Sequence, residues 1–373
     1  MREPTSRILS IHHERLDIPL REAFGIAGGT QAVAANVLVT VTLEDGTVGL
    51  GEAAPLPAYN GETQESTLAA LDGMRGAVVG MDARAWRGVA RRLSEGGDAR
   101  TGASEPKKGA GAPKLGAARC AVETAVLDAL LRQRGMSFHA FFGGAEAGLL
   151  TDITITTGTP EQAGEAAARW AKEGFRIFKV QVGGAGATMD VERVAAVKGS
   201  APHGEIFLDA NASLGAKEAI SLVEELSRRG IAIQMFEQPT PGGDWDALVE
   251  VGRHVVVAAD ESVVTAADAL VAAKKLGAPH VINIKLMKAG VVEALDIAAV
   301  ARAAGMGVMI GGNVESALAM SVSASLAAGM GGFGHVDLDT PLFLAESPFE
   351  GGMRLRGAAI ELDPAAGHGV SRL

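Results

Sequence analysis

Residues that could do chemistry recur at similar intervals along the second half of the chain. Asp209 (in FLDAN), Glu237 (in FEQP) and Asp260 (in ADES) each follow a short apolar run, and Lys285 ends the next run (NIKL). Successive members lie about 25 residues apart, which leaves room for one helix and one strand. If these runs are neighbouring parallel strands of a barrel, their four functional groups meet at the carboxyl ends of the strands.

Three carboxylates in one poorly solvated pocket would repel one another strongly. A hard divalent cation removes that repulsion, and Mg²⁺ prefers oxygen ligands in octahedral geometry. We therefore predict a Mg²⁺ site made of Asp209, Glu237 and Asp260. Each acid taken alone could instead cap a helix, but three in consecutive units favour the metal site.

Lys285 is the candidate general base beside this metal. It shares a strand face with Asn283, while Ile284 and Leu286 point the other way. We expect the cation and burial to lower the pKa of Lys285 into a range that suits proton abstraction.

Two further strands carry paired polar residues at the spacing that places both on one face. Lys179 and Gln181 alternate with apolar residues in FRIFKVQV, and Asp337 and Asp339 do so in HVDLDT. Because the metal does not need the second acidic pair, it suits a substrate ammonium group; the alternative is a pair of loop caps.

The elements that must position these residues follow a regular order from about residue 150 to 340. Apolar strands alternate with helices, and Gly174, Gly230, Gly277 and Gly305 stand where helices should end. Alternating units of this kind indicate parallel strands, and eight strands favour a closed barrel over an open doubly wound sheet. No strand leads into a G-x-G-x-x-G loop, so a dinucleotide-binding fold has little support.

The first 130 residues have a different pattern. Strand-like alternation surrounds Asp45-Gly46, a strong hairpin signal, and helical patterns begin near residues 65 and 117. Between the helices, residues 96–116 form a low-complexity stretch rich in Gly, Ala, Pro and Lys, which we interpret as a surface loop.

The order Lys-x-x, DAN, EQP, ADES and NIKLMKAG resembles the enolase superfamily, in its muconate-lactonizing subgroup (the mandelate racemase/muconate lactonizing enzyme family). DLDTPLFLAESPFEGG is similar to the dipeptide epimerases of that subgroup. The resemblance implies an α/β fold: a modified (β/α)7β TIM-type barrel with an N-terminal α+β capping domain completed by the C-terminal tail. The expected division is 1–130 for the cap, 131–340 for the barrel and 341–373 for the returning segment.

The resemblance also implies an activity and a set of contacts. The expected enzyme is a Mg²⁺-dependent isomerase that removes the proton α to a carboxylate through an ene-diolate, acting on a dipeptide or N-substituted amino acid. Asp337 and Asp339 would hold the α-ammonium group, and loops near 22–31 and 54–63 would close over the barrel mouth. The remaining expected contacts are Phe24, Ile26, Tyr59 and Thr157 with substrate, Asn211 beside the metal ligands, and Glu315, which either orients Lys285 or caps a helix.

One position departs from the pattern. The family carries Lys-x-Lys on the second strand with the second lysine as a base, and here Gln181 stands in that place. An amide cannot exchange a proton at neutral pH, so Lys179 would have to move in, or Lys285 would act alone. Two alternatives stay open: a one-base lyase or cycloisomerase, and a non-catalytic protein that binds amino-acid derivatives through Mg²⁺.

Composition excludes several other classes of function. The chain has 373 residues and a net charge of −10, which disfavours nucleic acid and anionic membrane surfaces as partners. Its one cysteine, Cys120, permits no intramolecular disulfide, and the N-terminus has no secretory signal, so a cytoplasmic location is expected. Residues 316–334 carry no charge and predict a buried helix of small residues. Family resemblance leaves a homo-oligomer open.

The cap region also bears on substrate choice. Residues 22–74 contain no Lys or Arg but several acidic residues. A pocket for an acidic side chain would need a cation. We therefore expect a dipeptide whose C-terminal residue is apolar or basic.

Overall fold

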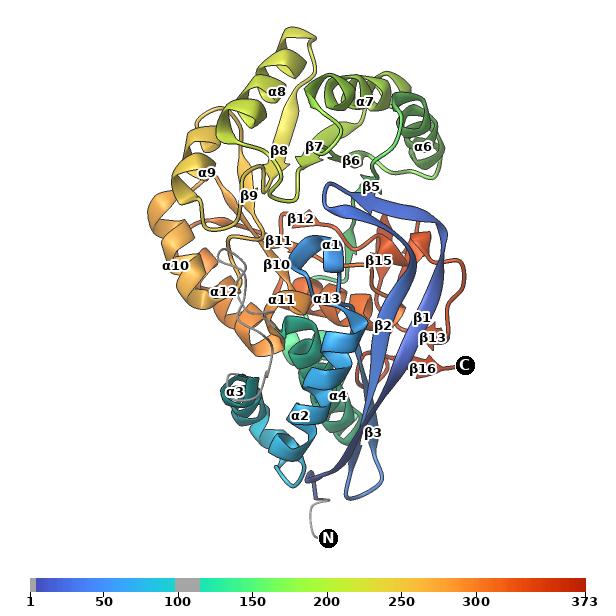
Figure 1. Cartoon of the computed structure of the whole chain (residues 1–373). Coiled ribbons are helices and arrows are strands. Elements are labelled where there is room, and N and C mark those ends of the chain that lie inside the picture. Colours follow the sequence, from blue (N-terminus) through green and yellow to red (C-terminus); the bar gives the residue numbers. More distant parts are fainter. Residues whose placement is uncertain (1–4, 98–114) are drawn as a thin grey trace.

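The computed structural model describes residues 5–97 and 115–373 (Figure 1). A ring of parallel strands with outer helices forms one part, and a long antiparallel hairpin with its own helices forms the other. Most of the low-complexity stretch predicted as a surface loop, residues 98–114, lies outside the described residues.

The barrel sheet has eight parallel strands that are hydrogen-bonded in chain order. They are β5 (Ile153–Ile155), β6 (Ile177–Gln181), β7 (Glu205–Asp209), β8 (Ile233–Glu237), β9 (Val257–Ala259), β10 (Val281–Lys285), β11 (Gly307–Gly311) and β12 (His335–Val336). The backbone N–H of Asp152, just before β5, donates to the carbonyl of Val336 in β12 at 2.9 Å. The first and last strands therefore meet, and the predicted barrel is confirmed over the open sheet.

Outer helices connect the strands. They are α6 (Pro160–Lys172), α7 (Ala187–Ser200), α8 (Ala216–Arg228), α9 (Trp245–Gly252), α10 (Ala266–Lys275), the short α11 (Leu286–Ala289) with α12 (Val291–Ala303), and α13 (Ala317–Met330). The four predicted helix-ending glycines all have positive φ, and Thr159 caps α6 by accepting the backbone N–H of Gln162. After β12 the chain enters a 3-10 helix, η2 (Thr340–Phe343), rather than an outer helix.

The cap is built on an antiparallel sheet of β1 (Ile8–Ile26), β2 (Gly29–Leu43) and β3 (Val48–Ala53), with the predicted Asp45-Gly46 turn between β2 and β3. Its helices are α1 (Pro57–Asn60), α2 (Gln64–Val78), η1 (Ala83–Ala85), α3 (Trp86–Gly97), α4 (Gly116–Arg134) and α5 (Phe138–Phe142). The sheet packs so closely on α4 that a Cβ at Gly51 would lie 2.0 Å from the carbonyl oxygen of Ala121. Only glycine fits there.

The C-terminal segment returns to the cap. Its strands are β13 (Phe349–Gly351) paired with β16 (Val370–Arg372), and β14 (Arg354–Arg356) and β15 (Ala359–Glu361), which pair beside β4 (Gly148–Leu150). The buried carboxylate of Asp128 in α4 accepts the backbone N–H of His368 (3.0 Å), the backbone N–H of Leu50 (2.9 Å) and Nε of Arg132 (2.7 Å). This carboxylate joins tail, sheet and helix in one place.

The uncharged stretch near residue 320 forms α13, whose residues from Leu318 to Gly329 are buried, as predicted. Across residues 5–97 and 115–373, no helix is long and apolar enough to cross a membrane. Cys120 lies buried in the core of the cap.

Candidate active site

The predicted metal ligands come together at the carboxyl ends of three neighbouring strands. Asp209 and Glu237 are paired residues at the ends of β7 and β8, and Asp260 directly follows β9. All three residues are buried, with at most 1% of their surface exposed. The sequence places them there because each directly follows a run of buried apolar residues in or at the end of its strand.

Two lysine ammonium groups flank Glu237. Lys179 of β6 has its Nζ atom 2.9 Å from Glu237 Oε2, and also 3.1 Å from Asp209 Oδ2 and 2.7 Å from Asp337 Oδ2. Lys285 of β10 has its Nζ atom 2.6 Å from Asp260 Oδ2 and 3.9 Å from Glu237 Oε1. Four steps around the ring separate β6 from β10, so the two lysines reach the site from opposite sides.

These contacts set the protonation of the site. Burial alone would lower the pKa of Lys285, but the negative charges of Asp260 and Glu237 outweigh it and raise that pKa. We predicted a lowered pKa for Lys285. The structure gives a raised pKa instead, because the ammonium group lies at contact distance from carboxylates. Burial raises the pKa of Glu237 to about 8. For Asp260, the ammonium groups of Lys285 and Lys288 overcome the effect of burial and lower the pKa.

Gln181 lies where the alternation places it. It is buried on the same inward face as Lys179, is paired in register with Asp209, and its Nε2 donates to Asp209 Oδ2 at 3.1 Å. Its Oε1 atom has no hydrogen-bond partner among the described residues. The side chain can orient Asp209 but has no proton to exchange.

The sequence prediction missed two residues beside Asp260, and one of them, Lys288, holds its carboxylate in place. Lys288, in α11, donates to Asp260 Oδ1 (2.8 Å), to the Asp260 carbonyl (2.8 Å) and to the Asn283 carbonyl (2.7 Å). Glu261, beside Asp260, has both carboxylate oxygens buried without a hydrogen-bond partner among the described residues, and burial raises its pKa. In the sequence, Lys288 stands in KLMK, three residues after Lys285, and Glu261 directly follows Asp260. Neither pattern shows which side chain points into the barrel.

Asn283 and Asn211 support the same carboxylates. Asn283 Nδ2 donates to Glu237 Oε1 at 2.8 Å. Asn211, expected beside the metal ligands, donates from its backbone N–H to Asp209 Oδ1 (2.9 Å) and from Nδ2 to Oδ2 (3.2 Å).

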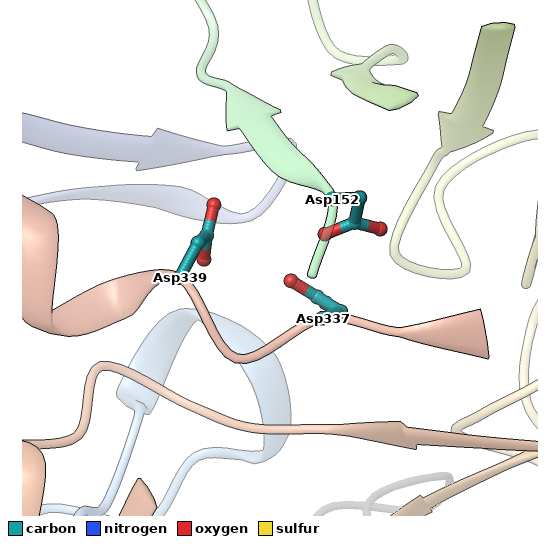
Figure 2. A group of neighbouring side chains, drawn as sticks. All are labelled: Asp152, Asp337 and Asp339. Carbon is teal, nitrogen blue, oxygen red and sulfur yellow. The ribbon is translucent and has the colours of Figure 1, made fainter. Parts of the chain in front are cut away.

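A second acidic cluster lies at the seam of the barrel (Figure 2). Asp337 and Asp339, expected to hold an ammonium group, are joined there by Asp152, and one oxygen from each lies within 4.8 Å of the others. Asp152 is 1% exposed, and neither of its oxygens has a hydrogen-bond partner among the described residues. Asp339 Oδ2 accepts the backbone N–H of Thr154 at 2.6 Å. Burial raises the pKa of Asp339 to about 7, so a cation entering the cluster would be favoured.

Sequence reasoning passed over Asp152 because it lies just before the start of its strand, whereas candidate residues were sought at the carboxyl ends. Alternation backwards from Thr154 would have placed it on the inward face, since side chains two residues apart share a face. Its proximity to Asp337 depends on closure of the ring between β5 and β12, which no local pattern reveals.

The oxygen ligands suit a hard divalent cation. Glu237 Oε2 and Asp260 Oδ2 accept no well-directed hydrogen bond from the described residues and instead face lysine ammonium groups. Three carboxylates at the ends of neighbouring strands, two of them with an oxygen left without a hydrogen bond within the described part of the chain, supply the oxygen ligands that Mg²⁺ takes. The residues present therefore fit the predicted ion.

The cap closes over this site. A cavity of about 30 Å³ above the lysines is lined from the cap by Phe24, Ile26, Leu56 and Tyr59. The Tyr59 hydroxyl donates to Asp260 Oδ1 at 3.3 Å, and Lys285 Nζ lies 4.7 Å from the centre of the Tyr59 ring. Both predicted lid loops thus line this cavity: residues 22–31 form the tip of the β1–β2 hairpin, and residues 54–63 include α1.

The two remaining candidates lie at the edge of the site. Thr157 lines a neighbouring cleft rather than this cavity, and its backbone N–H donates to the Gly25 carbonyl at 3.1 Å. Glu315 is buried and accepts the backbone N–H of Asn313 at 2.7 Å, while its neighbour Ser316 caps α13. Burial raises the pKa of Glu315 to about 8.

Comparison with known proteins identifies the family of the chain. Residues 10–143 match the mandelate racemase / muconate lactonizing enzyme N-terminal domain, and residues 162–372 match the enolase C-terminal domain-like family. The chain belongs to this family. An aromatic dipeptide epimerase of Herpetosiphon aurantiacus is 45% identical over 99% of both chains.

Solved structures of this mandelate racemase/muconate lactonizing family agree. A family protein from Herpetosiphon aurantiacus superposes with a TM-score of 0.91 at 44% identity, covering 99% of each chain. A dipeptide epimerase from Enterococcus faecalis, complexed with Mg and L-Leu-L-Tyr, gives 0.88 at 30% identity, covering 98% of this chain and 100% of that one. The predicted family, fold and enzyme class are confirmed: the chain is an isomerase of the epimerase type.

Proposed function

We propose that this protein is a Mg²⁺-dependent dipeptide epimerase that prefers non-acidic C-terminal residues. The observation that carries the proposal is the seam cluster of Asp152, Asp337 and Asp339 beside the lysine-flanked metal ligands. Buried carboxylates without enough partners select a cation, and a free dipeptide offers an ammonium group at a fixed distance from its carboxylate. The relatives named as dipeptide epimerases support the same substrate class.

In the proposed reaction, the substrate lies between the seam cluster and the metal ligands. Asp337 and Asp339 hold the α-ammonium group. Lys285 removes the α-proton of the C-terminal residue on one face, which requires that a cation on Asp260 and Glu237 offset the carboxylate charges that raise its pKa. Mg²⁺ bound to Asp209, Glu237 and Asp260 would neutralise the second negative charge that develops on the substrate carboxylate. Return of a proton to the opposite face gives the epimer.

Lys179 is the group we propose for that opposite face. Its ammonium group lies within 3.1 Å of three carboxylates, and although burial works against the charged form, Asp209, Asp337 and Glu237 raise its pKa. It is therefore a protonated acid placed across the barrel from Lys285. Gln181, two residues further along β6, orients Asp209 instead.

The preference for non-acidic C-terminal residues follows from the lining of the cap. Phe24, Ile26, Leu56 and Tyr59 supply apolar and aromatic surface over the reacting centre. Residues 22–74 contain no Lys or Arg, so a carboxylate side chain placed against this cap surface would find no cation of the cap to pair with.

Gln181 favours a second candidate, a one-base cycloisomerase or lyase of the same superfamily. In that reaction Lys285 alone would move the proton, and no group on the opposite face would be needed. The two candidates predict different labelling of the α-carbon.

The deciding experiment is incubation of the protein with Mg²⁺ and L,L-dipeptides in D₂O, read by NMR and mass spectrometry. Deuterium with inversion at the C-terminal α-carbon is expected. Deuterium with retention would establish the one-base candidate, and no exchange with any dipeptide would refute both the epimerase and the ammonium subsite.

The ammonium subsite has its own control. Asp339→Asn keeps an acceptor for the Thr154 N–H but removes the charge, so kcat/KM for free dipeptides should fall roughly 10- to 100-fold, the loss of about 1.5–3 kcal/mol for a charged hydrogen bond. Asp363→Asn, in the tail, is the matched control and should leave the rate unchanged. An unaffected Asp339→Asn variant would remove the role of Asp339.

A further inference from the structure

A large cleft opens at the barrel seam, beside the site already described. It has a volume of about 910 Å³ and lies between α6 and η2, beneath β1 of the cap. Arg21 and Phe24 line it from the cap, Ala166 and Trp170 from α6, and Phe343 from η2. The cleft exists because β12 continues into a 3-10 turn where the other strands are followed by a full helix.

The roof of the cleft is fixed at both ends. Near the site, the Thr157 N–H donates to the Gly25 carbonyl at 3.1 Å. At the other end, the Ala345 N–H donates to the Pro19 carbonyl (2.8 Å), and Nε of Arg21 donates to the Leu344 carbonyl (2.8 Å). These bonds tie β1 to the barrel and hold the cleft open as part of the fold.

Phe24, Trp170 and Phe343 give the cleft an aromatic wall, and two of the charged side chains around it pair with each other. Phe343 packs edge-on against Phe24 and Trp170, with ring centroids 5.4 and 6.3 Å apart. The guanidinium group of Arg169 lies 5.1 Å from the centre of the Trp170 ring and 3.7 Å from a carboxylate oxygen of Glu22. Such a surface favours an apolar or aromatic guest over a charged one.

The cleft begins where the ammonium subsite ends. Phe24 and Thr154 line both the cleft and the cavity over the lysines. The Thr154 N–H holds Asp339 Oδ2 at 2.6 Å, and η2 starts at the residue after Asp339. A group whose ammonium is held at Asp337, which lines the cavity beside Thr154, would have its α-carbon close to the residues shared with the cleft.

We propose that this cleft binds the side chain of the first residue of the substrate and selects a bulky aromatic or long apolar one. The inference rests on the proposed epimerase function and assigns its two specificity pockets. The C-terminal residue, whose α-carbon must lie between Lys179 and Lys285, has about 30 Å³ beneath the cap, against about 910 Å³ for the first residue. Size selection is thus stronger at the second position, and bulk is accepted at the first.

The test compares substrates and variants of the full-length protein. We expect kcat/KM for L-Phe-L-Ala to exceed that for L-Ala-L-Phe by at least tenfold. Ala166→Trp fills the cleft and should lower the ratio of kcat/KM for L-Phe-L-Ala to that for L-Ala-L-Ala at least tenfold. Ala168→Trp makes the same change on the same helix at a position that does not line the cleft, and it should keep the native ratio.

The outcomes separate the two proposals. If no dipeptide exchanges deuterium, the epimerase proposal itself fails. If dipeptides are epimerised but the preference is reversed, or if Ala166→Trp and Ala168→Trp give the same ratio, the assignment of the cleft is wrong while the function stands. Phe343→Ala is a second test that does not require a tryptophan to fit into the cleft. Because it removes an aromatic wall, it should lower the ratio of kcat/KM for L-Phe-L-Ala to that for L-Ala-L-Ala at least threefold.

Discussion

Replacement of Lys179 by methionine tests the proposed proton donor directly. Methionine has a similar length but no ammonium group, so Lys285 and the metal ligands stay while the opposite face loses its acid. General acid–base catalysis contributes about 10²- to 10⁴-fold to a rate, so epimerisation by Lys179→Met should fall by that factor, or about 3–5 kcal/mol. Exchange of deuterium with retention, driven from the Lys285 face, should persist.

The same change has a cost in stability that the assay must separate. Lys179 Nζ contacts Asp337, Glu237 and Asp209 in a buried setting. Breaking a buried ion pair by removing one partner costs about 3–5 kcal/mol, and added Mg²⁺ should restore part of it by binding two of the stranded carboxylates. Rates are therefore measured at saturating Mg²⁺ on protein whose thermal unfolding has been checked. Lys172→Met, at the exposed end of α6, is the control.

The result that refutes this reasoning is inversion by Lys179→Met at the native rate. Gln181→Lys gives the complementary reading. Because it adds a lysine where Lys179 already serves, we expect a change of less than about threefold, whereas a gain of the magnitude typical of an added acid, 10²-fold or more, would show that the native protein lacks one.

Three further predictions concern the scaffold and its pH dependence. Burial raises the pKa of Glu123 to about 7, above its ordinary value of 4.5, so the native state holds a proton that the unfolded state loses. Denaturant titrations should therefore show the free energy of unfolding falling by about 3 kcal/mol between pH 4.5 and 7. Glu123→Gln should remove this part of the pH dependence. Asp128→Asn should lower the free energy of unfolding by about 3 kcal/mol, measured by urea denaturation. Glu361→Gln, on the exposed tail, is the control. Equal urea midpoints for the two variants would contradict the proposed role of Asp128 in joining the tail to α4. Gly51→Ala should abolish soluble folded protein on expression, since its Cβ would overlap the Ala121 carbonyl, while Gly76→Ala, with open space around it, should express normally.

The barrel and most of its site could be predicted because the signals are local. Helix caps such as Thr159, helix-ending glycines and alternating strands each act within a few residues. An acid directly after a buried strand must lie at the carboxyl edge of the sheet, so Asp209, Glu237 and Asp260 could be placed without knowing any contact.

The remaining features depend on contacts between distant parts of the chain. Lys179 meets Asp337 across 158 residues, and the direction of its pKa shift depends on that meeting. Asp152, Lys288 and the seam cleft are defined only once the ring closes and the cap settles on it. A sequence pattern shows which face of a strand or helix a residue is on and which edge of the sheet it is near. It does not show which side chains from distant parts of the chain come into contact.

The carboxylate of Asp128 also constrains how the protein is made. Its partner His368 lies 240 residues further along the chain. At about 5–20 residues per second, the ribosome would deliver that partner roughly 10–50 s after Asp128 emerges. During this interval the whole barrel is synthesised while the core of the cap lacks its last strand pair. Final assembly of the cap is thus delayed until the barrel has been synthesised, and during that time the Asp128 carboxylate lacks its partner in the tail.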